Sequence, residues 1–129
     1  MIQRTDGAFT CKTFLAGANI AAYTICKFGS DDDSLVPAAA ATDVLVAVSK
    51  EAVASGARGD FQMEGIGEVK LGAAGACTRG DSITADAAGL GTPLAAAATI
   101  KSCIGMAMAS GANGDIIPVH INKWTAVTA

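Results

Sequence analysis

Short apolar runs along the chain are separated by polar segments rich in glycine, aspartate and serine. Val44, Val46 and Val48 alternate with other residues, and a similar alternation recurs over residues 104–108. A period of two places successive side chains on opposite faces of a strand, and β-branched residues favour strands. The pattern therefore predicts strands at residues 20–28, 44–49, 61–71, 82–84, 101–108 and 116–121.

One turn sequence occurs twice with a single change. Residues Ala54–Asp60 return as Ala109–Asp115, with Asn113 in place of Arg58. Each copy lies between two apolar runs, where glycine supplies positive φ and aspartate accepts hydrogen bonds from nearby backbone amides. The sequence thus predicts hairpins, and a third Gly-Asp pair precedes the run at 82–84. The predicted turn residues are Gly56, Gly59, Asp60, Gly80, Asp81, Gly111, Gly114 and Asp115.

The ends of the chain fit this pattern less well. Residues 1–15 show no clean period and are expected to form an extended N-terminal arm, which leaves residues 16–129 as a single β domain. Residues 38–54 taken alone also suit a helix, because alanine is the best helix former, but the alternating valines favour a strand. Short strands between closely spaced turns predict an all-β fold, a small single-domain β-barrel or β-sandwich built from hairpins.

Composition bears on the partners of the chain. Hydrophobic residues make up 51% of the 129 residues but aromatic residues only 5%. An alanine-rich core buries little area per residue, which at about 25 cal/mol per Å² favours further burial against a partner. The net charge is −3 and the nine basic residues are scattered, which argues against nucleic-acid binding. No apolar run approaches the ~20 residues that span a bilayer, so no membrane partner is expected, and no targeting segment is recognised.

The sequence holds no recognised catalytic or cofactor motif. The nucleophile elbow, the zinc-protease motif, the phosphate-binding loop and the dinucleotide fingerprint are all absent. Cys11, Cys26, Cys77 and Cys103 contain no Cys-x-x-Cys pair, so no metal site is expected. They allow two disulfides in three connectivities, but buried free thiols in a reducing compartment suit the chain better. We expect no cofactor, no metal and no enzymatic activity.

Two alternative functions would use residues that a purely structural protein does not need. His120 falls on the more polar face of the last predicted strand, and a pair with Cys77 or Cys103 would suit a Cys/His-dependent hydrolase. A surface or interface histidine is the simpler interpretation. The Arg-Gly-Asp tripeptides at residues 58–60 and 79–81 would suit a secreted β-sandwich adhesin, but turn chemistry accounts for both and nothing marks secretion.

Three segments together resemble a known family. They are Gly80-Asp81-Ser82-Ile83-Thr84-Ala85-Asp86-Ala87-Ala88-Gly89, Ile104-Gly105-Met106-Ala107-Met108-Ala109, and Gly114-Asp115 before a final β-run. In this order they are similar to the small capsid decoration, or cement, proteins of tailed bacteriophages, and the likeness covers residues 17–122. The resemblance implies a β-barrel or β-sandwich that binds the major capsid protein on the capsid exterior and stabilises contacts between capsomers.

The resemblance also implies self-association, as a homotrimer in preference to a homodimer, and a virion location after synthesis in the host bacterial cytoplasm. The expected interface residues are Ile2, Arg4, Phe9, Phe14, His120 and Trp124. Another minor phage component, such as a head-fibre base, tail-tube or minor shell subunit, would share this composition. Copy number per particle separates the two classes, because a cement protein is present in hundreds of copies.

Overall fold

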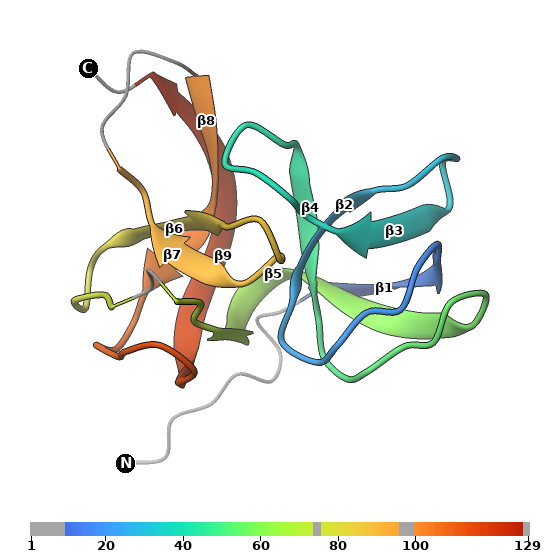
Figure 1. Cartoon of the computed structure of the whole chain (residues 1–129), viewed down its shortest axis with the longest axis horizontal. Helices are drawn as coiled ribbons and strands as arrows, with labels where there is room; N and C mark the ends of the chain where they lie inside the picture. The colour runs from blue at the N-terminus through green and yellow to red at the C-terminus, as the bar shows by residue number, and fades with distance from the viewer. Residues whose placement is uncertain (1–9, 74–75, 96–99, 128–129) are drawn as a thin grey trace.

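Nine strands and no helix make up the part of the chain that the computed structural model describes, residues 10–73, 76–95 and 100–127 (Figure 1). The strands are β1 (Thr10–Ala16), β2 (Ile25–Phe28), β3 (Ser34–Pro37), β4 (Leu45–Ser49), β5 (Arg58–Lys70), β6 (Ser82–Ala85), β7 (Gly91–Pro93), β8 (Ile100–Ala107) and β9 (Ile116–Val127). They form one sheet in the order β1-β3-β2-β4-β5-β9-β8-β6-β7, and β1 also pairs with β5. The predicted all-β fold is confirmed, and it is a barrel.

The N-terminal unit is a closed five-stranded barrel of β1 to β4 and the first half of β5. β1 runs parallel to β3 and antiparallel to β5, so the ring β1-β3-β2-β4-β5 returns to its starting strand. One row across β1, β5 and β4 consists of Cys11, Gln62 and Val48. The next row places Thr13 beside Asp60.

The C-terminal unit, formed by the second half of β5 and by β6 to β9, repeats this arrangement. β6 pairs with β7 and β8, and β8 pairs with β9, as β2 pairs with β3 and β4, and β4 with β5. β5 now takes the place of β1: the row across β5, β9 and β8 consists of Ile66, His120 and Met106. The parallel closure is reduced to one bridge, Leu71 to Gly91. β5 therefore belongs to both units and lies between them in Figure 1.

A turn of one design precedes β2, β5, β6 and β9. In each case an isolated bridge residue comes first, a two-residue turn follows, and the strand begins two residues after the turn. The second turn residue has positive φ: 61° at Tyr23, 86° at Gly56, 97° at Gly80 and 85° at Gly114. Glycine adopts this conformation freely, whereas a residue with a Cβ atom loses about 1 kcal/mol or more. Tyr23 is the position at which the fold accepts that cost.

The repeated heptapeptide does not follow the structural repeat. Its copies lie 55 residues apart, whereas the turns before β5 and β9 lie 58 residues apart, so Gly56 corresponds to Gly114 and not to Gly111. Gly59 and Asp60, predicted as turn residues, instead lie within β5 and pair with β1. The turn prediction was wrong for these two residues because β1 supplies a neighbouring strand for them.

The aspartates of the two later Gly-Asp pairs, Asp81 and Asp115, lie at turns. Asp81 accepts a hydrogen bond from the Thr78 amide at 2.8 Å, and Asp115 accepts one from the Ala112 amide at 2.9 Å. Each carboxylate therefore satisfies a backbone donor of its own turn. Gly111 forms the bridge that precedes the last turn.

Several predicted boundaries were wrong, although the pairs β4–β5 and β8–β9 are confirmed. Residues 10–15 lie in β1 because β3 and β5 both pair with it. The strand predicted at 20–28 shortens to β2, since the turn at Tyr23 interrupts it. Residues 38–43 form a turn and not part of a helix, and β9 continues to Val127, beyond the strand predicted at 116–121. β3 and β7 were not predicted, because both are short and each contains a proline.

The two units have separate cores of different character. Phe14 and Phe61 are buried in the N-terminal unit, in edge-to-face contact with their ring centroids 6.0 Å apart. The corresponding residues of the C-terminal unit are Val69 and Val119, which belong to an aliphatic cluster. The N-terminal core therefore depends on aromatic packing, whereas the C-terminal core depends on branched aliphatic side chains.

The N-terminal unit also contributes to the core of its neighbour. Ile25, Ala38, Leu45 and Val48 belong to the cluster built mainly from the C-terminal unit. They lie on or beside β2 and β4, so the outer side of these strands is covered by the C-terminal unit. Apolar contact therefore holds the two units together in addition to the shared strand β5.

Gly114→Ala is expected to lower the free energy of unfolding by about 1 kcal/mol. An added methyl group at Gly114 meets no atom within 4 Å, so the cost is that of holding a Cβ-bearing residue at positive φ. Denaturant unfolding followed by circular dichroism measures the change. Asn113→Ala, one residue earlier in the same exposed turn, serves as the control and should stay within about 0.5 kcal/mol of the parent chain. Equal effects of both substitutions would contradict the explanation.

Candidate interaction surface

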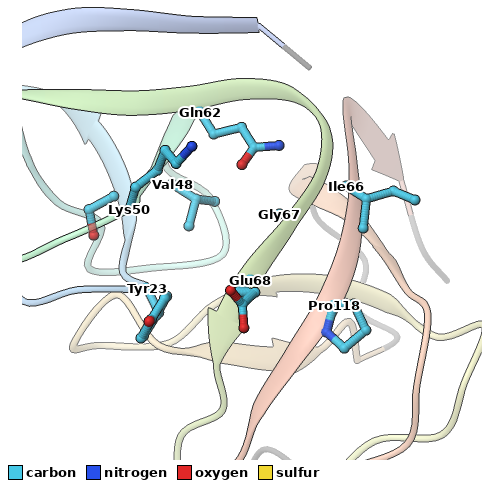
Figure 2. Close-up of a pocket in the computed structure, with 9 residues that line it drawn as sticks. Tyr23, Val48, Lys50, Gln62, Ile66, Gly67, Glu68 and Pro118 are labelled. Carbon is cyan, nitrogen blue, oxygen red and sulfur yellow. The ribbon is translucent and has the colours of Figure 1, made fainter. Parts of the chain in front are cut away.

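A groove of about 410 Å³ lies on the surface where the two units meet (Figure 2). Its lining residues are Tyr23, Val48, Ser49, Lys50 and Gln62 from the N-terminal unit and Ile66, Gly67, Glu68 and Pro118 from the C-terminal unit. Gln62 is 5% exposed, and its Nε2 atom donates a hydrogen bond to the Glu64 carbonyl at 3.0 Å. The strained backbone of Tyr23 places an aromatic ring on one wall. The groove thus offers an apolar surface, and two charged side chains, Lys50 and Glu68, line it as well.

The outer face of the C-terminal unit is the side of β5, β9 and β8 turned away from its core. Its three rows, read from β5 through β9 to β8 or the residue that follows it, are Ile66, His120 and Met106; Glu68, Pro118 and Met108; and Lys70 and Ile116. Met106 and Met108 are each 39% exposed and Ile116 is 45% exposed. Apolar side chains therefore surround His120 on a solvent-facing sheet, and they adjoin the groove through Ile66 and Pro118.

His120 does not form a catalytic pair with a cysteine. It is exposed on the outer face, whereas Cys103 is fully buried. Cys77 is also buried, and its thiol faces the Ala109 carbonyl at 3.8 Å. The arrangement lacks the hydrogen bond from nucleophile to base that a Cys/His hydrolase requires.

The buried thiols are poor nucleophiles. Burial raises the pKa of Cys26 to about 12, and burial likewise raises the pKa of Cys77 and of Cys103. The thiolate is the reactive form, so these three groups are protonated and shielded at neutral pH. Cys11 is the exposed cysteine, and all four are free thiols.

A thiol-reactive chromophore should therefore modify one cysteine per native chain and four per denatured chain. The native reaction is expected to disappear in Cys11→Ser, with the slow reaction of the buried thiols limited by unfolding. Fast modification of a second cysteine in the Cys11→Ser protein would contradict the burial of the other three.

Several charged residues form ion pairs or hydrogen bonds within the fold. Arg58 pairs with Asp33, and the Thr13 hydroxyl donates to Asp60 at 2.8 Å, so the first Arg-Gly-Asp tripeptide is a paired strand and not a displayed loop. Lys27 pairs with Asp43 at 3.3 Å. Within the described residues, no three histidine, cysteine, aspartate or glutamate side chains come together as a metal-binding group.

Phe14 corrects the expected interface. It was predicted to lie in the arm and to face a partner, but it is 2% exposed in the N-terminal core. Its ring contacts Phe28 and Phe61, and the Lys12 ammonium lies 4.2 Å from its ring centroid. The prediction failed because β1 is one strand of a closed barrel, and alternate side chains of such a strand point into the barrel core.

The other predicted interface residues divide into two groups. Ile2, Arg4 and Phe9 lie outside the described residues. His120 is exposed on β9, and Trp124 lies on the same strand opposite Cys103, its side chain being outside the description. The structure thus brings His120 together with exposed apolar residues that the sequence analysis did not single out. Part of the signal was present, since Met106 in β8 and Ile116 and Pro118 in β9 are apolar residues that alternate with buried ones.

Comparison with known proteins places this fold among phage head proteins. The chain is similar to the solved structure of the N base of the head fibre protein gp8.5 of bacteriophage phi29, with a TM-score of 0.69 and 21% identity over 88% of this chain and 94% of that one. No curated protein sequence matches. No helix in the described part is long and apolar enough to cross a membrane.

The match to a family model, together with this fold, defines the class as a structural protein of a phage that is associated with the capsid in the virion. The family can also be given: the profile of the phage cement proteins matches residues 4–121. The chain belongs to the phage cement protein family.

Proposed function

We propose that this chain is a non-enzymatic decoration protein, made in the host bacterial cytoplasm, that binds the major capsid protein on the outside of the capsid. There it stabilises contacts between neighbouring capsomers. The observation that carries the proposal is the family match over residues 4–121. The buried, protonated thiols support synthesis in a reducing compartment and the absence of a cysteine nucleophile.

Physical considerations agree with a surface-covering role. A protein contact of standard size buries about 800 Å² on each partner, and linked contacts to two capsomers gain effective concentration without new contacts. The closed barrel of the N-terminal unit is a rigid body for such contacts, because its strands are fixed by hydrogen bonds on both sides. Mechanical load between capsomers is then resisted by non-covalent contacts, and no catalytic step is needed.

The test is binding to expanded, empty shells that lack this protein. Purified chain should co-sediment with such shells and saturate at hundreds of copies per particle, and decorated shells should withstand higher temperature before they break. Absence of binding, or saturation without any effect on shell stability, would contradict the proposal.

A second candidate is the base of a head fibre, which the similarity to the phi29 structure favours. It predicts saturation at few copies or at restricted positions, and a further protein attached to the bound chain. Counting copies on the shell therefore separates the two candidates in one measurement.

We further propose that residues 1–9 contact the shell. They contain Ile2, Arg4 and Phe9, and they precede Thr10, the first residue of β1. Deletion of residues 1–9 removes no residue of the described strands, so it should leave the unfolding temperature unchanged and reduce shell binding at least tenfold. Full binding after the deletion would remove this segment from the contact.

A further inference from the structure

The outer face of the C-terminal unit is more apolar than its place in the fold requires. The N-terminal unit provides an internal comparison, because its rows correspond residue by residue. Met108 and Ile116 correspond to Lys50 and Arg58, and Pro118 corresponds to Asp60. The same backbone positions thus carry charged residues in one unit and apolar residues in the other. Folding does not demand the apolar choice.

One apolar residue on the corresponding side of the N-terminal unit is buried by a neighbouring part of the chain. Val48, which corresponds to Met106, is 2% exposed because the C-terminal unit packs on it. Met106 is 39% exposed because no part of the described chain covers it. At this one position the chain itself buries the residue of the N-terminal unit and leaves the corresponding residue of the C-terminal unit uncovered.

The outer face carries two charged residues of opposite sign, Glu68 and Lys70. Glu68 and Lys70 are exposed, carry opposite charge and lie two residues apart on β5, so both point outward. Among the described residues, neither takes part in an ion pair. A twofold axis through this face would place Glu68 of each copy opposite Lys70 of the other, since in a twofold contact residue i meets j and j meets i.

We propose that this face binds the same face of a second copy of the chain, related by a twofold axis. Met106, Met108, Ile116 and Pro118 form the apolar centre, and the two Glu68–Lys70 pairs fix the orientation. The flexible methionines allow the two surfaces to adjust to each other. This twofold contact gives a dimer, in place of the trimer that the resemblance implied. It concerns contact between copies and does not depend on the proposed capsid association.

The first test is the mass of the purified chain by sedimentation equilibrium. We expect a monomer–dimer equilibrium with a dissociation constant in the micromolar range, followed from about 1 µM to about 1 mM. The double variant M108K/I116R installs the residues that the N-terminal unit carries at the same positions, so the fold accommodates them. It should weaken dimerisation at least tenfold. Val44→Lys, which alters a 72% exposed apolar residue outside the face, is the control and should dimerise as the parent does.

The second test exchanges the charges. Glu68→Lys and Lys70→Glu each place like charges opposite one another and should weaken the dimer, whereas the exchange E68K/K70E restores opposite charges and should restore it. A parent chain that is monomeric at every concentration, a dimer unaffected by M108K/I116R, or an exchange variant as weak as the single variants would each overturn the proposal. So would a monomeric parent whose shell binding is lost in M108K/I116R, because the face would then belong to the capsid contact. Normal dimerisation without shell binding would instead contradict the proposed function alone.

Discussion

Phe14→Ala should lower the free energy of unfolding by about 3–5 kcal/mol, a large part of the stability of a small domain. The ring is 2% exposed and packs edge-to-face on Phe61, and the core around it contains few other large side chains. Its removal leaves a cavity in a closed barrel whose strands cannot move together without breaking hydrogen bonds on both sides. Chemical denaturation at 25 °C, with both transitions fitted to two states, measures the difference.

Phe28→Ala is the matched control for this substitution. Phe28 touches the same ring, with centroids 6.3 Å apart, but it is 49% exposed. Its truncation should therefore cost about 1 kcal/mol. The same reasoning predicts that a chain beginning at residue 15 does not fold, whereas a chain beginning at Thr10 does. A stable Phe14→Ala protein, or a folded chain that begins at residue 15, would show that β1 is dispensable.

The sequence was sufficient to predict which segments form hairpins, but not which residues form the turn between the strands. Alternating valines and the Gly-Asp segments predicted the pairs β4–β5 and β8–β9 correctly, because strand period and turn chemistry are local properties. The turn before β5 nevertheless uses Gly56 where the sequence repeat also offered Gly59. That choice depends on β1, a partner far away in the chain, and a local pattern contains no information about such a neighbour. The duplicated architecture was hidden for the same reason, since the sequence repeat and the structural repeat differ by three residues.

The candidate surface was predictable only in part. His120 was identified as an exposed residue because it was the one histidine on the polar side of a strand. The apolar residues around it were read as strand formers, since methionine and isoleucine at alternating positions suit a core as well as an interface. Which side of β8 and β9 is inner becomes clear only when the barrel closes. Comparison of the two units then distinguishes apolar residues that the fold needs from those that it does not.

Gly105→Ala should destabilise the protein by at least about 3 kcal/mol, by a mechanism unlike that of Phe14→Ala. Gly105 lies on β8 opposite Ile121 of the antiparallel neighbour β9, beside a register shift. A Cβ atom there would overlap the carbonyl oxygen of His120, and it would lie 2.8 Å from the His120 carbonyl carbon and 3.0 Å from the Ile121 Cα atom. These are backbone atoms, so relief requires the two strands to separate.

The N-terminal unit explains why a glycine is needed at this point. Its corresponding residue is Ala47, which is fully buried, and there β4 pairs with β5 at Val48 and Ser49 only. β8 instead stays paired with β9 from Ala107 to Ile100, so its backbone must approach β9 more closely over the length of the strand.

Gly67→Ala on β5 separates backbone overlap from crowding of side chains. Its added methyl group would lie 2.8 Å from Gln62 Oε1 and 2.9 Å from Ile121 Cδ1, both at the ends of side chains that can turn away. It should therefore cost clearly less than Gly105→Ala. Hydrogen exchange should show the difference in mechanism: amides of β8 and β9 lose protection in Gly105→Ala, while those of β1 to β4 keep theirs more fully. Equal loss in the two variants, or uniform loss over both units, would mean that close strand approach at Gly105 does not hold the C-terminal unit together.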